Sequence, residues 1–313
     1  MKTVQKPLLW CILLAGLTGL FYLSSPDPAG VSADEGTSVV LLTDAGPVRT
    51  TMGEYLPQAV AAEMPAGFGA EALKAQAVAA RTFVLACRRH GDADVCTSSG
   101  CCLGWLDEQA LRERWGGDFA RNMQAVRDAV AATDGEYLAY GGQAIQAAFH
   151  AGSIAATEDS GAIWSPLPYL VSVPSPETAE NAPELVSTVT ISPARLAGAL
   201  ALDPAGADPA GWAEPPILDD AGRVRTMTVL GKGFSGATLR SLLGLRSTAF
   251  TVDWDGSDFC FTVSGYGHGV GMSQTGAKLY AARGMSYRDI LAHYYPGTEL
   301  VGPEAQDRGS PSR

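Results

Sequence analysis

The densest group of chemically reactive side chains lies in the segment 90–105, HGDADVCTSSGCCLGW. His90, Cys96, Cys101 and Cys102 place one imidazole and three thiols within thirteen residues, a ligand set that suits tetrahedral zinc. If all four side chains bind the ion, no coordination position stays open, so the zinc is expected to be structural. The alternative is a disulfide between Cys96 and Cys101 or Cys102, which an oxidising space outside the cell would permit.

A glycine-rich segment, YGHGVGMSQ at 266–274, has the second distinctive composition. Glycine at every second position disfavours a regular helix or strand and favours backbone that lies beside a ligand, although a tight structural turn is the alternative. No Lys-Ser or Lys-Thr follows at the spacing of a nucleotide-binding loop. Tyr266, His268, Ser273 and Gln274 supply an aromatic face and hydrogen-bonding groups, and we predict that they form one wall of a glycan groove.

His150 and Ser153 follow the apolar run AIQAAF and are candidates for the opposing wall of this groove. A lone histidine at the end of a strand is more often a structural group with satisfied hydrogen bonds than a catalyst. Both interpretations stay open at the level of the sequence.

The elements that position these residues are predicted from apolar spacing and turn residues. The segment 70–89, AEALKAQAVAARTFVLACRR, is rich in alanine without proline or glycine and gives the strongest helix prediction. A short helix is expected at 53–62, an amphipathic helix at about 107–133, and a hairpin turning at Gly141-Gly142 within 136–150. Strand-like runs follow Arg223. Strands and helices without regular βαβ alternation predict an α+β fold in one curved domain.

The amino-terminal sequence predicts export. Lys2 and Lys6 precede an apolar run from Pro7 to Leu23, which is about long enough to span a membrane with a cytoplasmic amino terminus. Val31-Ser32-Ala33 loosely resembles a cleavage site, but it lies far beyond the apolar run, so retention of the segment as an anchor is favoured. We therefore predict a cytoplasmic segment 1–6, an anchor 7–23, a linker 24–49, a domain 50–300 and a flexible tail 301–313.

The overall composition excludes one class of partner. The chain of 313 residues is 46% hydrophobic, so it can bury a substantial core. It carries 33 Asp and Glu against 22 Lys and Arg, and this acidic balance argues against nucleic acid as a partner. If the partner is itself anionic, local contacts rather than long-range attraction would have to capture it.

Three segments together resemble the stage II sporulation protein D family, which also occurs in amidase-enhancer proteins of the bacterial wall. They are YLPQAVAAEMPAGFGAEALKAQAVAARTF, FHAGSIAATEDSGAIWSPLPYLVSV, and LLGLRSTAFTV through GYGHGVGMSQTGAKLYAARGMSYRDILAHYYPGTEL, and the resemblance covers about residues 50–300. The chain departs from the family at GFG, where a Trp-Pro pair is usual, and at AGSIAATE, where a Ser-Gly-Gly-Thr run is commoner.

The resemblance implies a peptidoglycan lytic transglycosylase that cleaves glycan strands stripped of their stem peptides to anhydro-muramyl ends. It places the enzyme in the mother-cell membrane, facing the engulfed forespore, with an amidase and a membrane scaffold as partners. Some family members hold zinc with His, Cys, His and Cys at the four cluster positions; here Cys101 takes the third. A non-catalytic wall-binding enhancer of an N-acetylmuramoyl-L-alanine amidase is the alternative that the same resemblance allows.

Within this resemblance, Glu71 occupies the catalytic position. One carboxyl group can protonate the glycosidic oxygen and then accept the proton of the sugar's C6 hydroxyl, which closes an anhydro ring without water. A glutamate in the first turn of a helix is also a common capping residue, and the helix end lowers the carboxyl pKa that a general acid needs raised. Glu54 and Glu63 are rival carboxylates, expected on solvated faces of the preceding helix.

Arg81 lies about three helical turns after Glu71 on the same predicted helix. Its long side chain is a candidate for contact with a muramyl carboxylate. An ordinary surface ion pair is the alternative for this residue.

Overall fold

The computed structural model describes residues 32–87 and 90–302. The predicted anchor 7–23 lies outside this range, as does most of the predicted tail. Within the described ranges, no helix combines the length and apolar character needed to cross a bilayer.

The described residues form a mixture of short helices and strands, which confirms the predicted α+β class. The α-helices are α1 (Ala33–Gly36), α2 (Met52–Glu63), α3 (Ala70–Ala86), α4 (Glu108–Trp115), α5 (Phe119–Ala131), α6 (Ser160–Ile163), α7 (Pro193–Leu200), α8 (Gly236–Leu243), α9 (Gln274–Ala282) and α10 (Tyr287–Tyr294). The 3-10 helices are η1 (Ala66–Phe68), η2 (Gly116–Asp118), η3 (Pro183–Leu185) and η4 (Pro209–Gly211).

The strands pair in small sheets rather than in one large one. They are β1 (Ser38–Thr43), β2 (Gly46–Thr51), β3 (Val95–Cys96), β4 (Tyr137–Tyr140), β5 (Gln143–Ala144), β6 (Phe149–His150), β7 (Val186–Ile191), β8 (Ile217–Leu218), β9 (Val224–Val229), β10 (Lys232–Ser235), β11 (Ala249–Trp254), β12 (Phe259–Ser264), β13 (Met272–Ser273) and β14 (Glu299–Val301). The sheet orders are β2-β1-β3, β10-β9-β8, β11-β12-β7, β13-β6 and β14-β4-β5.

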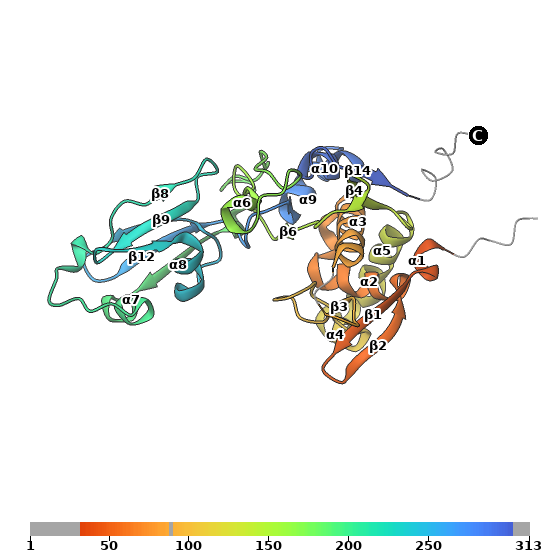
Figure 1. Cartoon of the computed structure of the whole chain (residues 1–313), viewed down its shortest axis with the longest axis horizontal. Coiled ribbons are helices and arrows are strands. Elements are labelled where there is room, and N and C mark those ends of the chain that lie inside the picture. Colours follow the sequence, from red (N-terminus) through yellow and green to blue (C-terminus); the bar gives the residue numbers. More distant parts are fainter. Residues whose placement is uncertain (1–31, 88–89, 303–313) are drawn as a thin grey trace, which may run out of the picture. The chain divides into compact units, whose positions relative to one another are not determined.

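The chain leaves one region at β6 and returns to it at β13. These two strands pair in parallel, with Phe149 opposite Met272 and His150 opposite Ser273. The residues between them build a separate apolar core from β7, β9, β11, β12, α7 and α8 (Figure 1). The glycine-rich loop and the segment after His150 therefore lie side by side, as the prediction of two facing walls requires.

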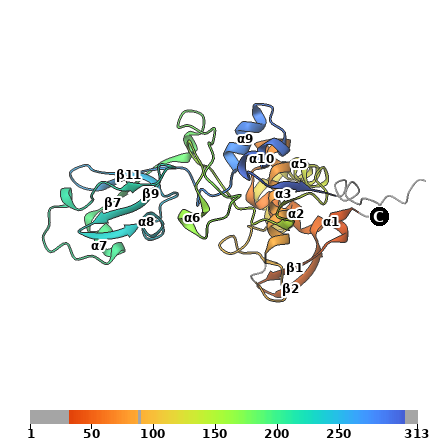
Figure 2. The same cartoon turned by 45° about the horizontal axis from the view of Figure 1, so that its top comes forward.

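Helix α3 is the centre of the larger core. Its sequence AEALKAQAVAARTFVLA buries residues on every side of the helix rather than on one stripe. Small alanine side chains let α2, α5, α9 and α10 pack closely around it (Figure 1, Figure 2). The amino-terminal turn of α3 keeps exposed positions, so a residue placed there is held by a buried helix and still faces solvent.

Two predicted boundaries differ from the structure. The expected helix at 107–133 is divided into α4 and α5 by η2 at Gly116–Asp118. Gly116 adopts a φ of +51°, which does not occur inside an α-helix and which residues with a side chain rarely adopt. The segment 33–49, placed in the predicted linker, instead forms α1, β1 and most of β2. The hairpin turn at Gly141-Gly142 is confirmed, because both glycines have positive φ between β4 and β5.

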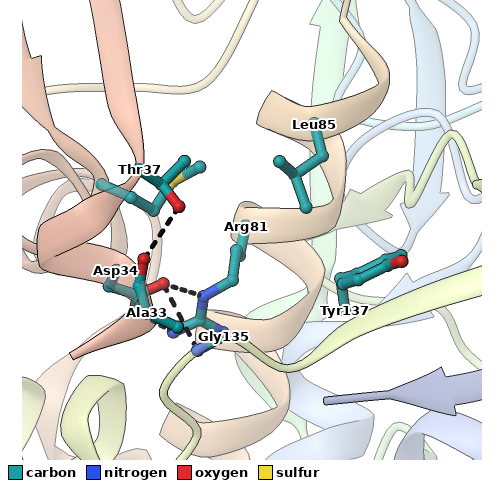
Figure 3. Close-up of a pocket in the computed structure, with 8 residues that line it drawn as sticks. Ala33, Asp34, Thr37, Arg81, Leu85, Gly135 and Tyr137 are labelled. Carbon is teal, nitrogen blue, oxygen red and sulfur yellow. Dashed lines mark hydrogen bonds and ion pairs between the residues drawn. The ribbon is translucent and has the colours of Figure 1, made fainter. Parts of the chain in front are cut away.

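Helix α1 is attached to the core by a buried ion pair (Figure 3). Arg81, 1% exposed in the middle of α3, donates from Nε and Nη2 to the two carboxylate oxygens of Asp34 at 2.7 and 2.5 Å, and from Nη1 to the carbonyl oxygen of Glu136 at 2.9 Å. The pair borders a cavity of about 260 Å³. The guanidinium group is therefore fully engaged in the fold, so Arg81 is neither a surface ion pair nor placed to reach a glycan.

We expect Asp34→Ala to destabilise the fold by about 3–5 kcal/mol, because it leaves a buried guanidinium group without its charge partner. The matched control is Glu108→Ala, which breaks an exposed pair with Arg112 and is expected to cost less than about 1 kcal/mol. Denaturant unfolding of both variants measures the difference. Equal, small losses would contradict the assignment of Asp34 and Arg81 to the core.

Candidate active site

Glu71 lies at the exposed amino end of α3, in its first turn. Gly69 precedes it with a φ of +94°, and an added Cβ there would meet nothing within 4 Å, so the backbone at this end is open. The Glu71 side chain is 31% exposed. Its Oε1 accepts a hydrogen bond from Lys74 Nζ at 2.7 Å, and its Oε2 accepts one from the Tyr287 N–H at 2.8 Å. Both oxygens are therefore held in place while the group stays accessible.

The surroundings of Glu71 come from three separate segments. Phe68 ends η1 just before α3, Tyr287 begins α10, and α9 packs along α3. Gln274, the first residue of α9, donates from Nε2 to the Glu63 carbonyl oxygen and to Gln76 Oε1, both at 3.1 Å. Gln274 therefore fixes α9 to α2 and α3, which is a positioning role rather than an open place on a groove wall.

The electrostatics of Glu71 favour its ionised form. Partial burial raises its pKa, but the hydrogen bonds from Lys74 and from the Tyr287 N–H lower it more, so the pKa lies below its ordinary range. These interactions contribute stability above the unfolded-state pKa, and that contribution is lost as the pH falls through the folded-state pKa. At neutral pH the resting group is a carboxylate, suited to accepting a proton, and must take one up before it can donate.

The two rival carboxylates have structural partners. Glu54 completes a capping box with Thr51 at the start of α2. Glu63 accepts a hydrogen bond from the Gly104 N–H, and burial raises its pKa. Glu63 is thus not on a solvated face as expected: it joins the end of α2 to the Cys/His segment.

His150 and Ser153 lie together in a buried polar network. Ser153 Oγ is 2.6 Å from His150 Nε2, and His150 Nδ1 is 3.2 Å from the Val270 carbonyl oxygen. Arg223 Nη2 donates to Ser153 Oγ at 2.8 Å. Since Nδ1 faces an acceptor it carries the ring proton, and the serine hydroxyl donates to Nε2. Burial, with His268 and Arg223 nearby, holds the His150 pKa well below its usual value, so the ring is neutral.

Glu177 connects Ser153 to the glycine-rich loop. Its Oε1 accepts from the Ser153 N–H at 3.2 Å and from the Ser273 hydroxyl, and its Oε2 accepts from the Ser175 hydroxyl at 2.5 Å. Ser153 and Ser273 are fully buried. Glu177 therefore joins the two predicted walls at these serines, where an open groove between them was expected.

The alternating glycines are explained by close packing on this network. A Cβ on Gly267 would come within 2.8 Å of His150 Cβ, and one on Gly271 within 2.0 Å of the Ala148 carbonyl oxygen. Both have positive φ. These glycines thus follow the alternative of a tight structural turn.

The exposed side chains of this region are aromatic. Tyr266 is 47% exposed, with the guanidinium group of Arg246 4.2 Å from its ring centroid. Trp164 is 50% exposed, and its ring centroid lies 4.9 Å from that of His268. Among the residues predicted to line the groove, Tyr266 is the one that is largely exposed. Trp164 adds a second exposed aromatic ring, which was not predicted from the sequence.

Glu158 is a further carboxyl group that the sequence did not single out. It is buried 3.5 Å from Arg223 Nε, and burial together with the nearby Asp219 raises its pKa to about 7. No local motif marks it, because its partners lie more than sixty residues away in the chain.

The Cys/His cluster is brought together as predicted. One ligand atom from each of His90, Cys96, Cys101 and Cys102 lies within 4.8 Å of the others. Sulfurs bound tetrahedrally at about 2.3 Å from zinc lie about 3.8 Å apart, so the donor set and its spacing fit such an ion. Cys96 is part of β3, which pairs with β1, and the cluster therefore borders the core that surrounds α3.

Comparison with known proteins identifies the family. A family model described as Stage II sporulation protein (SpoIID) matches residues 48–140. Stage II sporulation protein D of Bacillus amyloliquefaciens is 37% identical over 254 residues, which cover 79% of this chain and 73% of the relative. The chain belongs to the stage II sporulation protein D family.

Other family members extend this result. Stage II sporulation protein D of Bacillus subtilis is 36% identical over 262 residues, covering 80% of this chain and 75% of the relative. A protein named Amidase enhancer, also from Bacillus subtilis, is 30% identical over 301 residues, covering 76% of this chain and 39% of that protein. The family model includes Glu71 and the Cys/His cluster, whereas the glycine-rich loop lies beyond the residues that it matches.

We expect Lys74→Met to raise the pKa of Glu71, because it removes one of the two hydrogen bonds that favour the carboxylate. Titration of a ¹³C-labelled Glu71 carboxyl by NMR measures this directly. Lys232→Met, in a different core, is the control and should leave the midpoint unchanged. A Glu71 midpoint in the wild type above the ordinary glutamate range would contradict the geometry described above.

Proposed function

We propose that this protein is a lytic transglycosylase that cleaves peptidoglycan glycan strands through Glu71. The observation that carries the proposal is the placement of Glu71: it is the accessible acidic group at the open end of a buried helix, with each oxygen oriented by a separate donor. Membership of the stage II sporulation protein D family supports a role in sporulation, and we propose the cell-wall glycan as the substrate.

The proposed reaction uses one carboxyl group twice. Protonated Glu71 donates its proton to the oxygen of the glycosidic bond, and the bond from C1 to that oxygen breaks. The resulting carboxylate accepts the proton of the C6 hydroxyl of the same muramic acid, and O6 bonds to C1. The products are a shortened strand with a 1,6-anhydro-muramyl end and a released strand with a free hydroxyl, and no water is consumed.

The lowered pKa of Glu71 sets a condition on the first step. A bound glycan would exclude water from the carboxyl group, and an anionic group on the sugar would add like-charge repulsion; both effects raise a carboxyl pKa. Displacement of Lys74 from Oε1 by the substrate would act in the same direction. The protonated form is thereby favoured in the complex rather than in the free protein.

The cellular setting of the proposal rests on the predicted anchor, for the membrane, and on the family resemblance, for sporulation. We propose a single-pass membrane protein whose domain faces the space between mother cell and forespore during engulfment. There an amidase would remove stem peptides and supply the stripped strands, and a membrane scaffold would hold both proteins.

The four side chains of the Cys/His cluster are proposed to hold a structural zinc ion. Three thiolates and one imidazole would complete its coordination, so the ion takes no part in the proposed chemistry. Its effect would be to stiffen the loop 90–105, which is tied to α2 through Glu63 and Gly104.

A second function is favoured by one specific relative. Because the Amidase enhancer is 30% identical to this chain, the protein could bind wall glycan and stimulate an amidase without cleaving the strands itself. This alternative predicts binding and amidase stimulation in the absence of any anhydro-muramyl product.

The decisive prediction concerns Glu71→Gln. We expect the full-length wild type, purified in detergent, to release anhydro-muramyl ends from stripped glycan strands, and the variant to release less than about a hundredth as much, because the proton donor is lost. Mass spectrometry of the products measures both the reaction and its end group.

Glu54→Gln is the matched control, since this carboxylate caps α2 and should leave the rate unchanged. Circular dichroism and glycan binding of the Glu71 variant should match the wild type. Cleavage at the wild-type rate by Glu71→Gln would overturn the assignment, and stimulation of an added amidase without any product from the wild type would favour the enhancer.

The zinc proposal predicts about one zinc per chain by elemental analysis, with Cys96, Cys101 and Cys102 all titrating as thiols after denaturation. His90→Ala should lose the metal and lower the melting temperature, whereas His293→Ala, outside the cluster, should keep it. One oxidised cysteine pair in a metal-free protein would establish the disulfide alternative instead.

A further inference from the structure

Lys278 is an unusual cation in this acidic chain. It lies in α9, half-buried, with Nζ 5.2 Å from the ring centroid of Phe68. Among the described residues, no carboxylate forms an ion pair with it. An ammonium group that faces an aromatic ring, and that forms no ion pair with the described carboxylates, is available to an anion from outside.

The packing of α9 brings Lys278 to the same end of α3 as Glu71. Gln274, one helical turn before Lys278, is bonded to Gln76 of α3, and Lys278 itself reaches Phe68 just before α3 begins. From Gln274 to Lys278, α9 therefore extends along α3 from its middle toward its amino end. Phe68 and Glu71 are three residues apart, a span of at most about 11 Å between their Cα atoms.

Two lysines therefore lie at this end of the helix, near Glu71. Lys74 is paired with Glu71, and Lys278 has no such pair. The formal charge of the chain is -11, so an ammonium group without an ionic partner is opposite in sign to the overall field. Local capture of an anionic substrate requires such an arrangement, because long-range attraction is absent.

We propose that Lys278 binds a carboxylate carried by the glycan next to the bond that Glu71 protonates, and so selects strands whose muramic acid has a free lactyl group. This proposal rests on the proposed function. The lactyl carboxylate is an anion when no stem peptide is attached and a neutral amide when one is. A single ammonium group at this place would bind the carboxylate form more tightly than the amide form.

The competing explanation is that Lys278 only stabilises η1 by its contact with the Phe68 ring. Both roles need the aliphatic part of the side chain, but only the proposed one depends on the charge of the sugar. Lys278→Met keeps a long apolar side chain against Phe68 while removing the ammonium group, and Lys278→Arg keeps the charge.

The test is a binding measurement in the full-length Glu71→Gln protein in detergent, which prevents turnover. Two ligands are compared by calorimetry: stripped glycan strands with free lactyl carboxylates, and the same strands after conversion of those groups to methylamides. We expect Lys278→Met to weaken binding of the carboxylate strands about 3- to 5-fold, with no change for the methylamide strands. Lys278→Arg should bind both strands like the parent.

Lys232→Met is the control, because the exposed Lys232 also lies over a ring, that of Phe234, which belongs to the other core. Equal weakening for both ligands would reduce Lys278 to a support for η1 and overturn the proposal, as would no weakening for either. If the Glu71→Gln parent bound neither ligand, the proposal for Lys278 would also be overturned. Failure of the wild type to cleave strands, with the charge-dependent difference in binding present, would refute the transglycosylase and leave Lys278 as a carboxylate-binding residue.

Discussion

The packing of α3 by other elements on all of its sides is the constraint on which the rest of the structure depends. A helix that is apolar all round needs partners on every side, and its alanines admit α2, α5, α9 and α10 at close range. The same packing makes the one charged residue in its middle, Arg81, dependent on Asp34. The amino end of α3 reaches solvent, and the side chain placed there has a fixed position because the rest of the helix is packed on all sides.

The structure contains two polar systems of different character. Glu71 is accessible to solvent, and hydrogen bonds from Lys74 and the Tyr287 N–H orient its two oxygens. The network around Ser153 and Glu177 is closed, and its hydrogen bonds join the segment after β6 to the segment leading into α9. Because an insertion with its own core lies between these segments, a closed network at their junction adds to the core packing and the Gln274 hydrogen bonds that hold α9 and α10 against α3.

Much of this arrangement could be predicted from local sequence. The alanine-rich run specified α3, the Gly141-Gly142 pair specified a hairpin turn, and the spacing of His90 and the cysteines specified a cluster. The rest could not be predicted, because the deciding partners are remote: Asp34 lies 47 residues from Arg81, and Glu177 lies 96 residues from Ser273. A polar side chain looks the same in a sequence whether its partner is a sugar or a distant carboxylate.

The central claim is that one carboxyl group both gives and takes a proton, so that water is not a reactant. Cleavage of stripped glycan strands in H₂¹⁸O tests this most directly. Mass spectrometry should find anhydro-muramyl ends with no ¹⁸O, since the new bond at C1 is made by the sugar's own O6. Products that carry one ¹⁸O at a reducing end would instead show hydrolysis, which requires a second group to activate water and would contradict the account.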